Sequence, residues 1–136
     1  MTTALKRTPL HGHHVAADGK IVPFAGFEMP VQYPTGITTE HRAVRETAGL
    51  FDVSHMGEFV VKGPQARELV QYITVNDVAA IEVGQAQYSA MCLENGGVID
   101  DLLIYRFHDH YMLVVNASNL AKDWTWIEGQ SQAFEC

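Results

Sequence analysis

The sequence predicts an α+β fold, an antiparallel sheet meander with flanking helices. The main observation is three apolar segments in succession, at residues 86–93, 98–106 and 111–116. Turn sequences join them, at residues 94–97 (Glu-Asn-Gly-Gly) and 107–110 (Phe-His-Asp-His). Short turns with Gly and Asn between apolar runs are typical of β-hairpins, so the three strands are expected to pair in order. Helical patterns precede and follow this meander, which completes the α+β prediction.

The first third of the chain is rich in turn residues, and its elements are correspondingly short. Residues 20–24 are predicted to form a strand, which its proline restricts to an edge or an end. Residues 24–35 are apolar without clear periodicity, and we expect them to be irregular. A helix is predicted over residues 38–48, because Thr38 or Thr39 can cap it and a glycine follows it.

Two further elements flank the central meander. Residues 58–62 are predicted to form a strand, after which a second helix begins at Gly63-Pro64 with proline in its first position. Another helix is predicted over residues 118–127, capped by Ser118. The second helix carries its apolar side chains on one face: Ala66, Leu69, Val70 and Ile73.

Composition limits the classes of function. The 136 residues carry 16 acidic and 9 basic side chains, a formal net charge of −7. This balance argues against a partner that is a nucleic acid or an anionic membrane surface, because both require clustered Lys and Arg. No apolar run approaches the roughly 18 residues of a membrane helix, and no hydrophobic signal core is present. Cys92 and Cys136 form no disulfide framework or metal-ligand spacing, so we expect a cytoplasmic protein.

The chain is expected to divide into a turn-rich N-terminal segment with the first helix, residues 1–50, and the start of an α/β region, residues 51–136. The sequence after the last predicted helix adds no closing element, and the meander leaves sheet edges to be covered. We therefore expect residues 1–136 to be part of a larger fold, and self-association through the open edges is possible.

Asp100 and Asp101 are the first candidates for chemistry. Neighbouring residues of a strand point to opposite faces, so these two carboxylates cannot share a proton with each other. Asp100 has the parity of Leu102, and Asp101 that of Leu103, so either side chain could be partly buried. A buried carboxylate is costly unless it is hydrogen-bonded, and this makes a functional role for one of them plausible. The spacing alone also fits a role in capping the glycine turn.

Residues 51–57 (Phe-Asp-Val-Ser-His-Met-Gly) invite a hydrolase interpretation through Asp52, Ser54 and His55. Members of a catalytic triad are seldom all local in sequence, and no nucleophile elbow surrounds this serine. We therefore interpret the segment as a structured turn that leads into a strand, with Met56 packing inward.

His11, His13 and His14 form a cluster that could suggest metal ligands. No cysteine or carboxylate follows at a known ligand spacing, so no metal site is predicted. A histidine cluster in an N-terminal loop is usually solvated.

Several motifs that occur in order along the chain together indicate a specific family. The sequence resembles the aminomethyltransferase of the glycine cleavage system, the T-protein, over essentially its whole length. The segments that carry the resemblance are Phe-Ala-Gly-Phe-Glu-Met-Pro-Val at 24–31, Phe-Asp-Val-Ser-His-Met at 51–56, Gly-Gln-Ala-Gln-Tyr-Ser at 84–89, Gly-Gly-Val-Ile-Asp-Asp-Leu at 96–102 and Val-Val-Asn-Ala-Ser-Asn at 114–119.

The resemblance implies a function. Members of the family take an aminomethyl group from the lipoyl arm of the H-protein, release ammonia and pass the one-carbon unit to tetrahydrofolate, giving 5,10-methylenetetrahydrofolate. The second Asp of the Gly-Gly-x-x-Asp-Asp-Leu motif is the family's key acid, and by position it is Asp101. The resemblance implies that Asp101 orients the folate and supports the charge that develops as ammonia leaves.

The resemblance also implies a folate-binding wall around Asp101. Met56, Tyr88 and Val115 match family positions that line the pocket, with Leu113 and Asn116 beside them. The residue types at Tyr88 and Leu113 vary within the family, so only their shape and apolar character carry over.

The implied fold is the N-terminal portion of a three-domain folate-binding structure whose second region is ferredoxin-like. Related motifs occur in folate-binding halves of flavin-dependent dehydrogenases, but this sequence has nothing that resembles a flavin domain. A non-catalytic folate-binding relative and an inactive fragment of the same fold are the alternatives.

Overall fold

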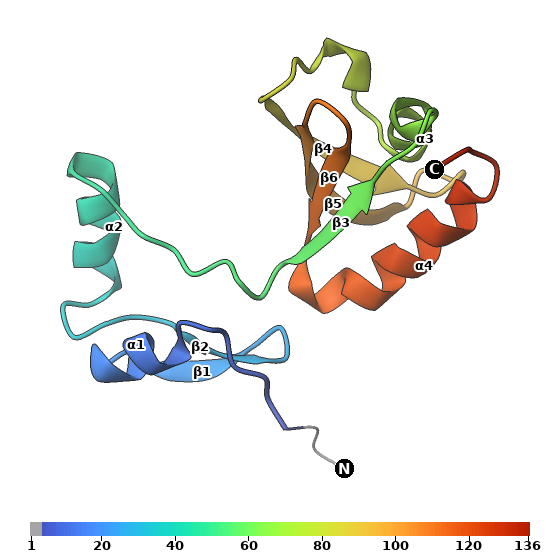
Figure 1. Ribbon diagram of the computed structural model, residues 1–136. Helices are drawn as coiled ribbons and strands as arrows, with labels where there is room; N and C mark the ends of the chain where they lie inside the picture. The colour runs from blue at the N-terminus through green and yellow to red at the C-terminus, as the bar shows by residue number, and fades with distance from the viewer. Residues whose placement is uncertain (1–3) are drawn as a thin grey trace. The chain divides into compact units, whose positions relative to one another are not determined.

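A computed structural model describes residues 4–136 (Figure 1), which form two compact units. The first unit ends at His55 and the second begins at Met56, within the segment of residues 51–57. The division expected from the sequence lies at residue 50. Each unit has its own elements and is described separately.

The first unit contains two helices, α1 (His11–Ala16) and α2 (Ile37–Glu46), and a two-stranded antiparallel sheet. The sheet pairs β1 (Ile21–Phe24) with β2 (Phe27–Pro30). The two residues between these strands, Ala25 and Gly26, both have positive φ angles, of 48° and 83°. This conformation suits a tight hairpin turn, which explains why the chain reverses here.

Three expectations for this unit are wrong in detail. Residues 24–35 are not irregular, because the turn at Ala25 lets residues 27–30 pair with the predicted first strand. The histidine cluster lies in α1 rather than in a loop. Helix α2 begins at Ile37 after Gly36, so neither threonine caps it.

The second unit is built on a four-stranded antiparallel sheet in the order β3-β6-β5-β4. The strands are β3 (Gly57–Val61), β4 (Ala86–Cys92), β5 (Val98–Arg106) and β6 (Tyr111–Val115). The predicted meander is confirmed, since β4 pairs with β5 and β5 with β6. Strand β3 then pairs with β6 on the far edge.

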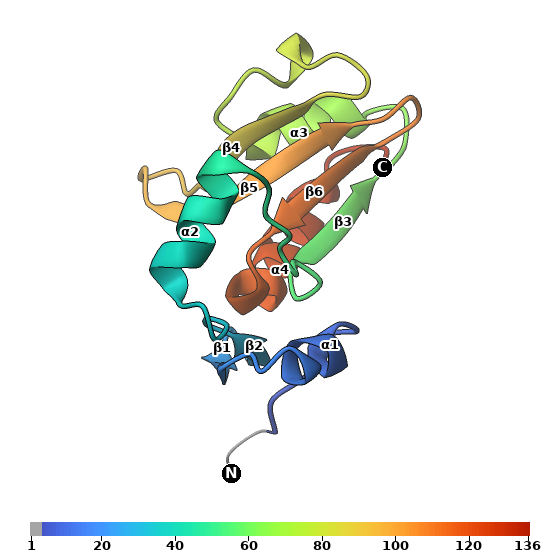
Figure 2. The same cartoon turned by 90° about the vertical axis from the view of Figure 1, so that its left-hand side faces the viewer.

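Two helices, α3 (Ala66–Ile73) and α4 (Leu120–Ser131), cover one face of this sheet, as Figure 2 shows. Short 3₁₀ turns, η1 (Val78–Ala80) and η2 (Ala117–Asn119), lead into β4 and α4. The apolar face predicted for the second helix is confirmed, because all of its members are buried. The core between helices and sheet includes Leu69, Val70, Ile73, Met91, Leu102, Ile104, Leu113, Val115 and Ile127.

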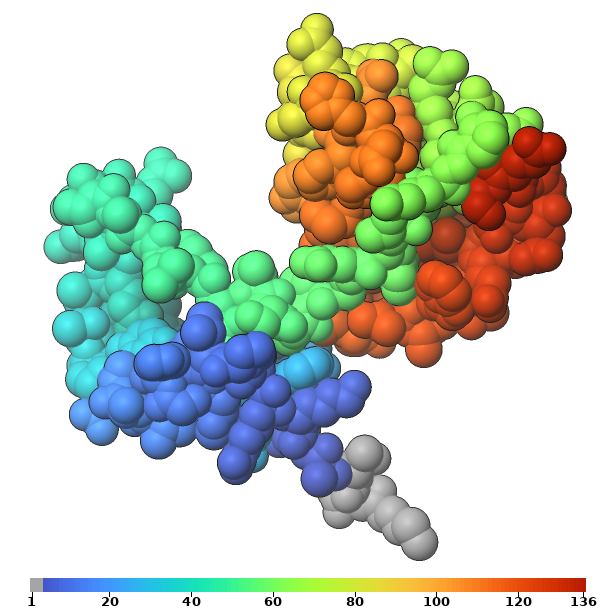
Figure 3. All heavy atoms as spheres, in the orientation of Figure 1, coloured from blue at the N-terminus to red at the C-terminus, as the bar shows by residue number. Residues whose placement is uncertain are grey.

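The helix starts differ from those predicted. Helix α3 begins at Ala66, so Pro64 precedes it and is not its first residue. Residues 117–119 form η2, and α4 has no side-chain cap at its start. In the space-filling view the C-terminal residues (red) lie against the segment that follows β3 (green; Figure 3), where the Gln65 amide donates to the Glu135 carbonyl. Within residues 4–136, each helix is too short or too polar to cross a membrane.

The sheet face opposite α3 and α4 is called the open face below. The row Tyr88, Leu103, Val114 crosses it from β4 to β6, because these residues are paired in register. Tyr88 is 63% exposed, and Leu103 and Val114 are half-buried. The second unit thus presents an apolar surface on a rigid antiparallel scaffold.

Candidate functional site

Asp100 and Asp101 point to opposite faces of β5, as their parity predicts. Asp100 lies on the helix-covered face with Leu102 and is 6% exposed, whereas Asp101 lies on the open face and is exposed. The two acids are therefore in different environments although they are adjacent in sequence.

Two neighbours hold the Asp101 carboxylate from either side. The Tyr88 hydroxyl donates to Asp101 Oδ2 at 2.8 Å, and Asn116 Nδ2 donates to Asp101 Oδ1 at 2.9 Å. Tyr88 reaches Asp101 diagonally across the β4–β5 pair, because its direct partner is Leu103. Asn116 follows the last residue of β6. Each carboxylate oxygen thus has one fixed donor, which restricts the rotation of the group on an exposed face.

The contact with Asp101 changes the pKa of the Tyr88 phenol. The hydrogen bond to Asp101, together with the charge of that carboxylate, raises the pKa of Tyr88 above its ordinary value. Tyr88 therefore remains a neutral hydroxyl donor, and its exposed ring adds an apolar surface beside a carboxylate acceptor.

Asp100 is held by amide donors on the other face. Asn119 Nδ2 donates to Asp100 Oδ1 at 2.8 Å and Asn116 Nδ2 at 3.1 Å. Burial by itself would raise the pKa of Asp100, but the hydrogen bonds from Asn116 and Asn119, with the neighbouring Asp123 carboxyl group, outweigh it and lower the pKa. Asn116 thus contacts both carboxylates and links the two faces of β5.

Asp123 is a buried acid beside the site that sequence reasoning missed. It lies on α4, is fully buried, and neighbours Asp100. Burial and the neighbouring Asp100 carboxylate raise the pKa of Asp123 to about 7. A polar residue in a helix of mixed character carries no signal of burial in the sequence, because the contact depends on how α4 packs on β5.

The remaining predicted folate-binding residues, Met56, Leu113 and Val115, differ in their burial. Met56 is half-buried and comes directly before β3. The side chains of Leu113 and Val115 are fully buried in the core, on the face opposite to Asp101. Strand parity places these two side chains beneath the sheet, and their part in a folate-binding wall stays a prediction.

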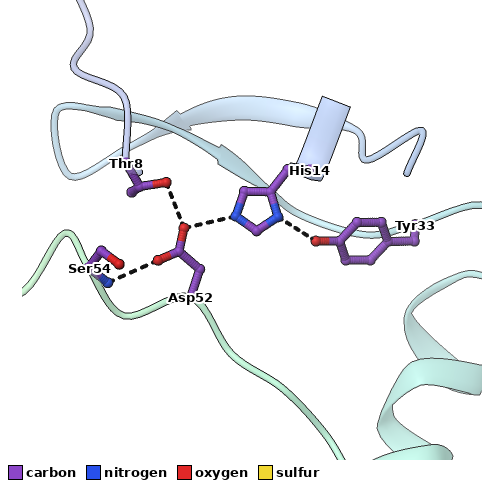
Figure 4. A network of polar contacts seen from close by, with 5 residues as sticks. All are labelled: Thr8, His14, Tyr33, Asp52 and Ser54. Carbon is purple, nitrogen blue, oxygen red and sulfur yellow. Dashed lines mark hydrogen bonds and ion pairs between the residues drawn. The ribbon is translucent and has the colours of Figure 1, made fainter. Parts of the chain in front are cut away.

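The motif at residues 51–57 has a structural role in the first unit (Figure 4). The Asp52 carboxylate, whose side chain is 2% exposed, binds three groups. The Thr8 hydroxyl and His14 Nε2 contact Asp52 Oδ2 at 2.6 and 2.8 Å, and the Ser54 amide donates to Oδ1 at 3.0 Å. The other ring nitrogen of His14 contacts the Tyr33 hydroxyl at 2.7 Å. Asp52 thus joins the start of the chain to α1 and to the segment before α2.

This network excludes the hydrolase interpretation. Ser54 meets Asp52 through its backbone amide, and the His55 ring packs against Phe24 and Phe27 with centroid distances of 5.7 and 6.1 Å. The expectation that the histidine cluster is solvated is wrong for His14, which is buried on Asp52. Among residues 4–136, no group of three or more His, Cys, Asp or Glu side chains could hold a metal ion.

Comparisons with known proteins agree with this architecture. The model of the GCVT N-terminal domain family matches residues 10–136. The chain belongs to this family. It is 59% identical over 128 residues to an aminomethyltransferase of Symbiobacterium thermophilum, and 54% identical over 134 residues to one of Desulfitobacterium hafniense. These alignments cover 93% and 98% of this chain, but only 34% and 36% of the relatives.

A solved structure confirms the fold. The glycine cleavage system aminomethyltransferase T of Bartonella henselae matches with a TM-score of 0.91 and 41% identity. The match covers 97% of this chain and 37% of that structure. The predicted fold class and family resemblance are therefore confirmed, and the chain spans about a third of the length of these relatives.

Proposed function

We propose that this chain is the N-terminal part of an aminomethyltransferase of the glycine cleavage system. The reaction transfers the one-carbon unit of an aminomethyl group, carried by the lipoyl arm of the H-protein, to tetrahydrofolate and releases ammonia. The observation that carries the proposal is the Asp101 carboxylate, held between Tyr88 and Asn116 on the open face of a family member. A cytoplasmic location is part of the proposal.

The open face has the chemistry that a pterin needs. A pterin ring is flat, has N–H donors on its edge and presents apolar faces. Asp101 supplies an acceptor for such donors, and the exposed ring of Tyr88 and the apolar pair Leu103 and Val114 supply surface for the flat ring. These residues fit the group, and tetrahydrofolate would supply the nitrogen nucleophiles that accept the one-carbon unit.

The role of Asp101 follows from its fixed position. A carboxylate whose hydrogen-bond donors are already in place needs little reorganisation when positive charge develops nearby. It can therefore stabilise the transition state in which ammonia leaves. The same carboxylate holds the acceptor in one orientation, which raises the probability of a productive encounter. Asp101 thus orients the folate and supports the developing charge.

Asp101→Asn in the full-length protein that carries this chain tests the proposal. Given aminomethyl-lipoyl H-protein and tetrahydrofolate, the variant is expected to lose on the order of a hundredfold in the rate of 5,10-methylenetetrahydrofolate formation. Asp109→Asn is the matched control, because Asp109 is an exposed carboxylate in the turn between β5 and β6. Equal rates for the two variants would refute the role of Asp101. A full-length protein without transfer activity that still binds folate would indicate a non-catalytic relative.

A further inference from the structure

The buried Asp123 has no role in the reaction as described, yet it lies one contact from the site. Asp100 Oδ2 and both Asp123 oxygens are buried and have no hydrogen-bond partner among the described residues. The two carboxyl groups are neighbours, since each shifts the pKa of the other. Two ionised carboxylates buried side by side without donors on these oxygens would be strongly unfavourable, so one of them carries the proton.

The contacts decide which carboxyl carries it. Asp100 already accepts two amide hydrogen bonds, from Asn116 and Asn119, which stabilise its charged form. Asp123 is fully buried and has no such donors, so its neutral form is favoured. The proton therefore resides on Asp123 and is donated to Asp100.

The chain of contacts continues to the open face. The charged Asp100 accepts from Asn116 Nδ2, and the same nitrogen donates to Asp101 Oδ1. We propose that Asp123 is a positioning residue for Asp101, acting through Asp100 and Asn116 as a buried proton donor. The pairing stands on the burial of the two carboxyl groups and on their proximity, whereas its consequence for folate rests on the proposed function.

The arrangement has a defined response to pH. Burial and the contact with Asp100 raise the pKa of Asp123 to about 7. The charged groups that act on Asp123 are Asp100 on β5, which disfavours its ionisation, and Lys122 on α4, which favours it. Lys122 is engaged with the Ile99 carbonyl at 2.6 Å. Above about pH 7, both carboxylates are charged and repel each other. We expect this repulsion to displace Asp100 and to weaken its hydrogen bond from Asn116.

Nuclear magnetic resonance of the ¹³C,¹⁵N-labelled chain tests the pairing without any ligand. We expect the Asp101 carboxyl carbon and the Asn116 side-chain amide to shift together in a step near pH 7. Asp123→Asn keeps a donor toward Asp100 but cannot titrate, so the step should vanish while both signals stay close to their low-pH positions. Asp109→Asn, the matched exposed control, should retain the step. A step that persists in Asp123→Asn, or is absent from the wild-type chain, overturns the proposal.

A second series links the pairing to folate. Tetrahydrofolate affinity of the full-length protein is measured at pH 6 and pH 8 for the wild type, Asp123→Asn and Asp123→Leu. The wild type is expected to bind about threefold to tenfold more weakly at pH 8 than Asp123→Asn does, and Asp123→Leu to be weak at both values. Equal pH dependence in wild type and Asp123→Asn overturns the positioning role. Absence of folate binding in every variant would instead refute the proposed function, because the resonance step is scored separately.

Discussion

The Asp52 network leads to a specific prediction for the first unit. Asp52→Ala removes a buried acceptor and leaves the Thr8 hydroxyl and His14 Nε2 without it. Breaking a buried ion pair or hydrogen-bond cluster from one side costs about 3 kcal/mol, the low end of measured values. Since Thr8 and His14 lie 44 and 38 positions from Asp52 in the sequence, the loss is expected to loosen the whole unit rather than one loop.

Hydrogen exchange of the backbone amides measures this effect locally. A loss of about 3 kcal/mol corresponds to a fall in protection of about a hundredfold for amides that exchange through opening of the unit. The amides to follow are those in the β1–β2 pairing, which lie in the first unit. Amides of β5 and β6 in the second unit serve as an internal reference.

Asp109→Ala is the matched control. Asp109 also contacts a histidine, His110, at 2.6 Å, but its side chain is 71% exposed. An exposed pair of this kind contributes little, so protection should not change measurably. Unchanged protection of β1 and β2 in Asp52→Ala, or an equal loss in β5 and β6, would refute the reasoning.

Three further predictions concern stability. Hydrogen bonds from Thr8, His14 and Ser54 outweigh burial and keep the pKa of Asp52 well below its usual range. The contribution of Asp52 to the stability of the first unit is therefore present above about pH 4 and is lost as the pH falls further. Exchange protection of β1 should fall with acid in the wild type and vary less in Asp52→Asn. Leu69→Ala, at a core position 1% exposed, should cost about 3 kcal/mol in urea unfolding followed by tryptophan fluorescence, and a cost near zero would contradict the core assignment. Gly63→Ala should cost more than about 1 kcal/mol in the same experiment, because Gly63 has a φ of +129° and an added Cβ would overlap the Glu135 carbonyl oxygen; wild-type stability would contradict that contact.

Local signals were sufficient to predict the meander of the second unit. Strand β5 has the predicted bounds, Val98–Arg106, because turn sequences with glycine, asparagine and aspartate delimit it on both sides. The opposite orientations of Asp100 and Asp101 follow from strand parity alone. Helix caps were predicted less well, since Gly36 and Gln65 precede α2 and α3 without a side-chain cap.

Contacts between distant residues could not be predicted from the residues alone. Asp52 and His14 are 38 positions apart, and neither residue carries a pattern that indicates the other. Asp123 is 23 positions beyond Asp100 on a helix whose packing decides the contact. The family resemblance of Leu113 and Val115 likewise did not indicate that their side chains point into the core.

The most direct test of the account is a titration of the ¹⁵N-labelled chain with tetrahydrofolate, followed by resonance shifts. The account predicts saturable shifts on the open face, at Tyr88, Asp101, Leu103 and Asn116, and their loss in Asp101→Asn. Even weak binding produces such shifts, so the result does not depend on high affinity. Saturable shifts confined to α3 and α4, or the absence of any saturable shift, would contradict the claim that Asp101 and the open face form a folate-binding wall.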